Sequence, residues 1–224
     1  MIFLTLTATQ IVLIIVLTCV VIGLICLGFY LLHLKIMLKR NIVRVYFKTV
    51  NKVALYNDYY LINDFRLEYE KDRELIYDHL LFGDKYIYVI KDRYYKGLLR
   101  GERSDATLRL VNKKTEKETL IENPILENDF LRKKLALRTQ IEEGVFISIV
   151  LVNDECDILS LDNNVSNSYI INRKDFASLI EAIESRDINP FNKEQLATIV
   201  SDIDKLNRRK KAKKQKKNDK RRKV

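Results

Sequence analysis

Cysteine, histidine and tryptophan are scarce in this chain of 224 residues, which contains three Cys, two His and no Trp. Cys19 and Cys26 fall in an apolar N-terminal stretch, and the third cysteine is Cys156. Three cysteines placed in this way offer no disulfide framework and are typical of a reducing compartment. The Cys and His residues also lack the spacing of a zinc site, so neither a disulfide-rich nor a zinc-binding domain is predicted.

Charge is absent from residues 11–34, which contain no Asp, Glu, Lys or Arg. As a helix, this stretch is about 36 Å long and can cross a hydrocarbon core of roughly 30 Å. A cleaved signal peptide is the alternative, but no Lys or Arg precedes the stretch and no small-x-small pattern follows it. Lys35, Lys39, Arg40 and Arg44 come directly after it. This positive-inside bias predicts a single-pass protein of the cell membrane, with its N-terminus outside and its domain in the cytoplasm.

The net charge of +10 is concentrated at the C-terminus. From Lys205 to Val224 there are thirteen Lys or Arg residues and one acid, Asp219, a net charge of +12, so the remaining 204 residues carry −2. Such a run attracts nucleic acid through counterion release, or an anionic membrane leaflet. No aromatic residue interrupts it to stack on bases. A solvated, disordered tail is the alternative. The polyanion-binding residues predicted in this tail (207–224) are Arg208, Arg209, Lys210, Lys211, Lys213, Lys214, Lys216, Lys217, Lys220, Arg221, Arg222 and Lys223.

A juxtamembrane segment (35–60) and one α/β domain (61–206) are predicted between the apolar stretch and the tail. Apolar runs and turn residues predict a central hairpin within residues 75–97, with its turn at Gly83–Lys85. Further strands are predicted at 61–67, at 145–152 and in a hairpin over 108–121 at the edge of the sheet, and residues 68–74 are predicted as a charged turn. Helices are predicted at 123–137, 172–185 and 192–206 from their caps and apolar spacing.

The central hairpin carries charges in strands that are otherwise apolar. Asp78 and His79 lie inside its first strand, and Lys91, Asp92 and Arg93 end its second. Strands this apolar are normally buried on both faces, so their charges must be paired or functional. Because residues two apart share a face, Lys91 and Arg93 should face one side of the sheet and Asp92 the other.

Tyr77-Asp78-His79, an apolar strand that ends in charges, and then Gly97 and Gly101 form a pattern that resembles the nuclease-related domain, a branch of the restriction-endonuclease-like fold. The resemblance implies a mixed central sheet flanked by helices, here between a transmembrane helix and a basic disordered tail. It also implies Mg²⁺-dependent nuclease chemistry, in which an Asp and a Glu-x-Lys signature on adjacent strands hold the metal and steady the phosphate.

Two departures from the family pattern concern this active site. Asp78 matches the first acid, but Lys91 stands where the family has Glu, and Arg93 stands where it has Lys. The family's N-terminal Gly-Glu pair, whose Glu belongs to the active site, has no counterpart. The resemblance therefore predicts a degenerate catalytic site in which Asp78, Lys91 and Arg93 form a buried ion-pair cluster, with no cofactor expected. The two cations of this cluster could still bind a phosphate.

An active nuclease remains open if a carboxylate has moved into the site, and Mg²⁺ is then expected with Asp78 as a ligand. Asp92 would serve if a slip or bulge turned it to the metal side. The other candidates are the nearby glutamates Glu68, Glu70, Glu74 and Glu102. Glu127, in the helix that begins at Asn123-Pro124, occupies a position where the family commonly has Gln, which makes a polar role possible.

The preferred interpretation is a membrane-anchored, non-cleaving protein that binds or scaffolds nucleic acid or another polyanion. A membrane-organising protein is the second alternative: its domain would be a spacer, and its tail would bind anionic lipid. No oligomeric state follows from the sequence.

Overall fold

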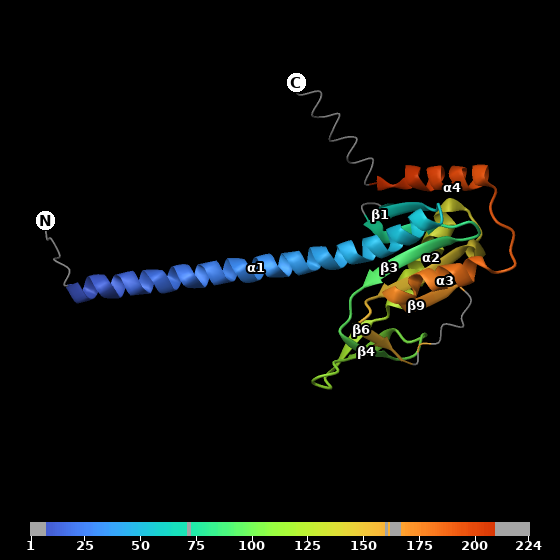
Figure 1. Cartoon of the computed structure of the whole chain (residues 1–224). Helices are drawn as coiled ribbons and strands as arrows, with labels where there is room; N and C mark the ends of the chain where they lie inside the picture. The colour runs from blue at the N-terminus through green and yellow to red at the C-terminus, as the bar shows by residue number, and fades with distance from the viewer. Residues whose placement is uncertain (1–7, 71–72, 160, 162–166, 209–224) are drawn as a thin grey trace, which may run out of the picture. The chain divides into compact units, whose positions relative to one another are not determined.

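The structure is a computed structural model that describes residues 8–70, 73–159, 161 and 167–208 (Figure 1). The chain forms two units, Met1–Val45 and Tyr46–Val224. Helix α1 (Ala8–Tyr56) includes the stretch Leu13–Leu34, whose 22 residues are long and apolar enough to cross a membrane. The predicted span of residues 11–34 is therefore part of one continuous helix.

The larger sheet of the second unit has the strand order β1-β2-β3-β7-β9. β1, β2 and β3 are antiparallel to one another, whereas β3, β7 and β9 run parallel. The predicted mixed sheet is thus confirmed. Its strands are β1 (Tyr60–Glu70), β2 (Arg73–Phe82), β3 (Ile87–Arg93), β7 (Phe146–Val152) and β9 (Ser168–Asn172).

The β1–β2 hairpin is longer than predicted. Leu67 pairs with Leu75, and Glu68 pairs with Glu74, so most of the expected charged turn is strand. Leu67, the last residue of the predicted strand, is buried in the core, and the pairing continues past it to Glu70 and Arg73.

A smaller sheet has the order β6-β5-β4-β8, and Figure 1 shows β4 and β6 at one end of the domain. The predicted hairpin at 108–121 belongs to this sheet and does not lie at the edge of the larger one. Gly97 redirects the chain after β3, because its φ of 134° suits glycine and a Cβ there would collide with the carbonyl oxygen of Val111. The strands are β4 (Gly97–Arg100), β5 (Thr107–Val111), β6 (Glu118–Glu122) and β8 (Cys156–Ile158).

The helices begin largely where their caps predict. The Asn123 side chain accepts a hydrogen bond from the Ile125 amide, and the Asn192 side chain accepts one from Glu194. The third helix starts later than expected, since its first residues form a 3₁₀ turn. The helices are α2 (Pro124–Thr139), α3 (Phe176–Glu184) and α4 (Lys193–Leu206), with the 3₁₀ turns η1 (Glu143–Val145) and η2 (Arg173–Asp175).

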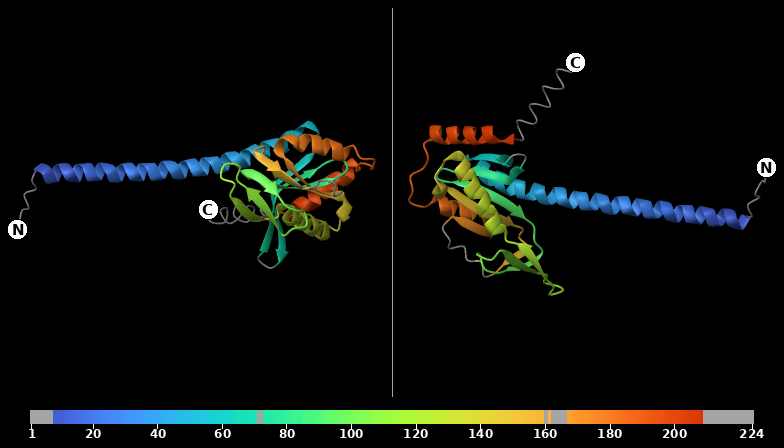
Figure 2. Two further views of the ribbon diagram at one scale, coloured as in Figure 1. Left: turned by 90° about the horizontal axis from the view of Figure 1, so that it is seen from below. Right: turned by 180° about the vertical axis from the view of Figure 1, so that it is seen from behind.

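Helices cover both faces of the larger sheet. On one face, α2 and α4 pack over a buried apolar cluster, and Figure 2 shows α2 lying along this face in the view from behind. On the other face, Tyr46 of α1 donates a hydrogen bond to the Arg93 carbonyl at 2.7 Å, and Tyr88 of β3 donates one to Glu184 of α3 at 2.6 Å. β3 therefore runs through the interior, where an unpaired charge is costly. Members of the cluster include Phe65, Tyr77, Phe82, Ile87, Val89, Leu131, Leu135, Phe146 and Ile203.

Candidate functional site

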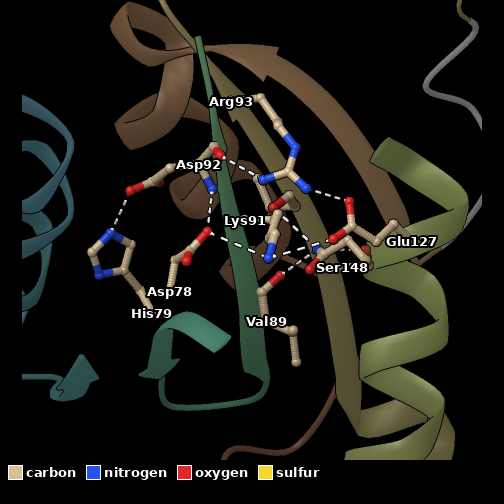
Figure 3. Close-up of polar contacts among 10 residues, drawn as sticks. Asp78, His79, Val89, Lys91, Asp92, Arg93, Glu127 and Ser148 are labelled. Atoms are coloured by element: carbon tan, nitrogen blue, oxygen red, sulfur yellow. Dashed lines mark hydrogen bonds and ion pairs between the residues drawn. The ribbon is translucent and has the colours of Figure 1, made fainter. Parts of the chain in front are cut away.

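The last three residues of β3 alternate between the two faces of the sheet (Figure 3). β3 pairs with β7 in unbroken register from Ile87 to Arg93, so no bulge turns Asp92 toward the Lys91 side. Lys91 lies on the face covered by α2 and is only 9% exposed. Asp92 lies on the face covered by α1.

Lys91 stands between two carboxylates that come from different elements. Its Nζ lies 3.5 Å from Glu127 Oε1 on α2 and 3.9 Å from Asp78 Oδ2 on β2. Arg93 donates to the second oxygen of Glu127 and to the Asp92 carbonyl, the latter at 3.1 Å. Asp78, Lys91, Arg93 and Glu127 form the charged cluster, in which acids and bases alternate and the formal charge sums to zero.

Lys91 is the innermost member of the charged cluster. The side chains of Asp78 and Glu127 are 30% and 38% exposed, whereas the Lys91 side chain is 11% exposed. Asp78 is also held from inside, because its Oδ2 accepts a hydrogen bond from the Asp92 amide at 3.0 Å. An approaching anion would meet carboxylates before it met the Lys91 ammonium.

Asn128 fixes the part of α2 that presents Glu127. It is fully buried, and its Nδ2 donates to the Val89 carbonyl of β3 at 2.9 Å and to Ser148 Oγ of β7 at 2.8 Å. A third contact at 3.2 Å reaches the Ile149 carbonyl. These bonds tie the second turn of α2 to both strands, so the neighbouring Glu127 is held over the end of β3.

A second polar group, Asn63, His79 and Asp92, lies on the opposite face and is called the histidine cluster here. His79 Nε2 is 2.9 Å from Asp92 Oδ2, and His79 Nδ1 is 2.5 Å from Asn63 Oδ1. Burial raises the pKa of Asp92 above its ordinary value, although the hydrogen bond and charge of His79 act in the opposite direction. Asp92 Oδ1 is buried and has no hydrogen-bond partner within the described part of the chain.

The Mg²⁺ implied by the resemblance does not fit these donors. Within residues 8–70, 73–159, 161 and 167–208, no group of three or more His, Cys, Asp and Glu side chains could hold a metal. The two carboxylates of the charged cluster instead face an ammonium group, which opposes a divalent cation. Of the other glutamates considered, Glu68 and Glu74 contact Arg208, and Glu70 contacts Arg73. Glu102 lies in the turn between β4 and β5.

Comparison with known families identifies the domain. The family model of the nuclease-related domain matches residues 42–153, which is half of the chain. The chain belongs to the nuclease-related domain family. No curated protein and no solved structure matches it. All four members of the charged cluster lie inside the residues that the family model matches.

The structure brings together most of the residues singled out in the sequence. Asp78 and Lys91 are in contact, whereas Arg93 joins them through Glu127. Asp92 lies with His79 on the other face. The sequence reasoning left the role of Glu127 open. The resemblance offered a signal, because it implied a base at Lys91 in place of an acid and an acid at Glu127 in place of Gln.

The tail is described only at its start. Arg208 contacts Glu68 at 3.0 Å and Glu74 at 3.7 Å, so this residue is attached to the β1–β2 hairpin. The other predicted polyanion-binding residues, from Arg209 to Lys223, lie outside the described residues.

Proposed function

We propose that this protein is a membrane-anchored member of the nuclease-related domain family that does not cleave nucleic acid and instead binds or scaffolds it, or another polyanion. The single observation that supports the loss of cleavage is the position of the Lys91 ammonium, 3.5 Å from Glu127 and 3.9 Å from Asp78. A nuclease of this fold needs such carboxylates free to hold Mg²⁺, which polarises the phosphate and activates water. Here both carboxylates are neutralised by side chains of the protein.

The basic tail is the proposed polyanion-binding element. The charged cluster is a poor phosphate site, because Lys91 and Arg93 are already paired with the carboxylates of Asp78 and Glu127. Residues 205–224, which include the tail, carry a net charge of +12, against −2 for the rest of the chain. The affinity of the tail for nucleic acid should fall steeply with salt, since binding releases counterions.

An active nuclease is the second candidate, and the convergence of Asp78 and Glu127 on one point favours it. It requires that Lys91 withdraw from between them. Full-length protein in detergent micelles would be titrated with Mg²⁺ in a calorimeter and incubated with supercoiled plasmid, beside an Asp78→Ala variant. We expect neither metal binding nor nicking in the parent. Mg²⁺-dependent nicking that disappears in the Asp78→Ala variant would instead establish the nuclease.

Deletion of residues 209–224 tests the tail. This boundary keeps Arg208 and its contacts with Glu68 and Glu74, so the domain should stay folded. In nanodiscs of uncharged lipid, the truncated protein should lose binding to labelled nucleic acid, whereas the parent should bind it with a strong salt dependence. Unchanged binding without the tail would refute its role. Loss of parental binding in nanodiscs rich in anionic lipid would show that the leaflet competes for the tail.

The proposed topology places the N-terminus outside and the domain in the cytoplasm. It rests on the span Leu13–Leu34 and on the Lys and Arg residues that follow it directly. Protease added to intact cells should leave the domain uncut and should digest it after the membrane is permeabilised. Digestion in intact cells would reverse the orientation.

A further inference from the structure

We propose that the cleft between the C-terminal part of α1 and the start of α3 binds a small phosphate ester, and that Lys52, Arg173 and Lys174 hold its phosphate group. The cleft lies within the second unit and has a volume of about 510 Å³. Small-molecule sites commonly measure roughly 300–1,000 Å³. This site includes neither the charged cluster nor the tail, so it goes beyond the proposed function.

The cleft lies at the carboxyl ends of two neighbouring parallel strands. β7 and β9 pair in register up to Val152 and Asn172, the last residue of each strand. Asp154 comes two positions after β7, whereas Arg173 and Lys174 follow β9 directly, and all three line the cleft. In open α/β sheets, ligands commonly bind outside the carboxyl ends of the strands. The place of the cleft in the fold therefore favours a ligand site.

One wall of the cleft is a single face of α1. Thr49, Lys52, Val53 and Tyr56 occupy positions i, i+3, i+4 and i+7 of this helix, so their side chains lie on the same side. Val53 is buried, whereas Tyr56 is 88% exposed. This wall therefore offers apolar and aromatic surface next to the ammonium group of Lys52.

The opposite wall is fixed by hydrogen bonds between the turn after β7 and the residues after β9. Asp154 accepts hydrogen bonds from the Arg173 side chain and from the Lys174 amide, the latter at 2.8 Å. The Asn172 side chain donates to the Asn153 carbonyl at 3.0 Å. Because these contacts join the two segments, the wall is in place before a ligand binds, which lowers the cost of binding.

The charges that line the cleft are mostly positive. Three cations, Lys52, Arg173 and Lys174, stand against one acid, Asp154, which is already bonded to Arg173. Within the described part of the chain, the ammonium groups of Lys52 and Lys174 form no ion pair. Arg173 has five N–H donors, so its contact with Asp154 leaves others for an anion. Cations gathered in one cleft attract anions and raise their local concentration.

The combination of cations and apolar surface indicates the class of ligand. Two ammonium groups and a guanidinium suit a phosphate group, which accepts several charge-assisted hydrogen bonds. The remainder of the ligand would contact Val53, Tyr56 and Ala177, the last of which is the second residue of α3. Nucleotides and the headgroups of phospholipids are both phosphate esters, and experiment separates these two sources.

The test is a calorimetric titration of the full-length protein in micelles of uncharged detergent. The probes are adenosine 5′-monophosphate, glycerol 3-phosphate and adenosine, which has no phosphate. One molecule of a phosphate ester should bind per chain, at least about tenfold more tightly than adenosine. Tighter binding of the nucleotide would assign the site to nucleotides, and tighter binding of glycerol 3-phosphate would assign it to lipid headgroups.

Lys52→Gln combined with Lys174→Gln should weaken binding of the phosphate ester at least about tenfold, because it removes two charged donors. The matched control is Lys117→Gln combined with Lys193→Gln. These two lysines are exposed and do not line the cleft, so the control loses the same charge and should bind like the parent. The tail is unchanged in both variants, so any binding of the probes by the tail is the same in each.

Ala177→Trp provides a second, independent variant. It keeps every charge and fills part of the cleft, so it should also weaken binding, and the exposure of Ala177 should let the variant fold. The proposed site is refuted if the parent binds neither phosphate ester or binds adenosine equally well. It is also refuted if either cleft variant binds like the parent, or if the control loses as much affinity as the Lys52 and Lys174 double variant.

Discussion

The three consecutive charged residues at the end of β3 are paired to different extents on the two faces of the sheet. On the face toward α2, Lys91 and Arg93 are paired with Asp78 and Glu127, and the charged cluster is neutral and partly exposed. On the face toward α1, Asp92 is bonded to His79, one of its oxygens has no partner in the described part of the chain, and burial raises its pKa. The comparison shows that β3 tolerates its charges through partners supplied by other elements, with complete pairing on only one face.

The largest expected effect on stability follows from removing the Asn128 side chain, which fixes α2 to the sheet. Asn128→Ala should destabilise the protein by about 2–4 kcal/mol, because it leaves buried acceptors on β3 and β7 without their donor. The measurement is the free energy of unfolding in detergent micelles, obtained by urea titration. Asn63→Ala provides the matched change on the other face and should cost less, because Asn63 is less buried. Equal losses in the two variants would contradict the contrast between the faces.

Removing the central cation of the charged cluster should have a smaller effect. Lys91→Met should lower the free energy of unfolding by about 1–2 kcal/mol. This loss is smaller than the roughly 3–5 kcal/mol typical of a broken buried ion pair, because water reaches both carboxylates. The same urea titration would measure it. Adding Glu127→Gln should recover part of the loss, since only one acid then remains opposite the methionine. A further loss in that double variant would show that repulsion between the acids is not the cause.

The smallest effect is expected on the other face and depends on pH. Because burial in the folded state raises the pKa of Asp92, the Asp92 carboxyl group binds its proton more tightly in the folded protein than in the unfolded chain. Stability from this group is therefore present below the ordinary Asp pKa near 3.8 and decreases as the pH rises toward the raised value. Asp92→Asn removes that slope, so the parent should lose stability relative to the variant as the pH rises above about 4. Urea titrations at several pH values would measure the difference, and a difference that grows in favour of the parent would contradict it.

Individual elements were predictable where local physics decides them. The length and apolarity of Leu13–Leu34, the caps Asn123 and Asn192, and the turn after β2 all act within a few residues of the chain. The alternation that separates Asp92 from its neighbours is equally local. The split into two sheets was missed, because it depends on how the chain turns at Gly97 and packs afterwards.

The sequence by itself determined the apolar span, the basic tail, and the order of strands and helices. Only the tertiary structure decided that Glu127 pairs with Arg93, which lies 34 positions earlier, and that it faces Asp78 across Lys91. The pattern of side chains along a segment specifies its secondary structure. Contacts between residues that are far apart in the sequence depend instead on how the helices and strands pack together. Here Asn128 docks α2 on β3 and β7, and that contact brings the second carboxylate to the ammonium of Lys91.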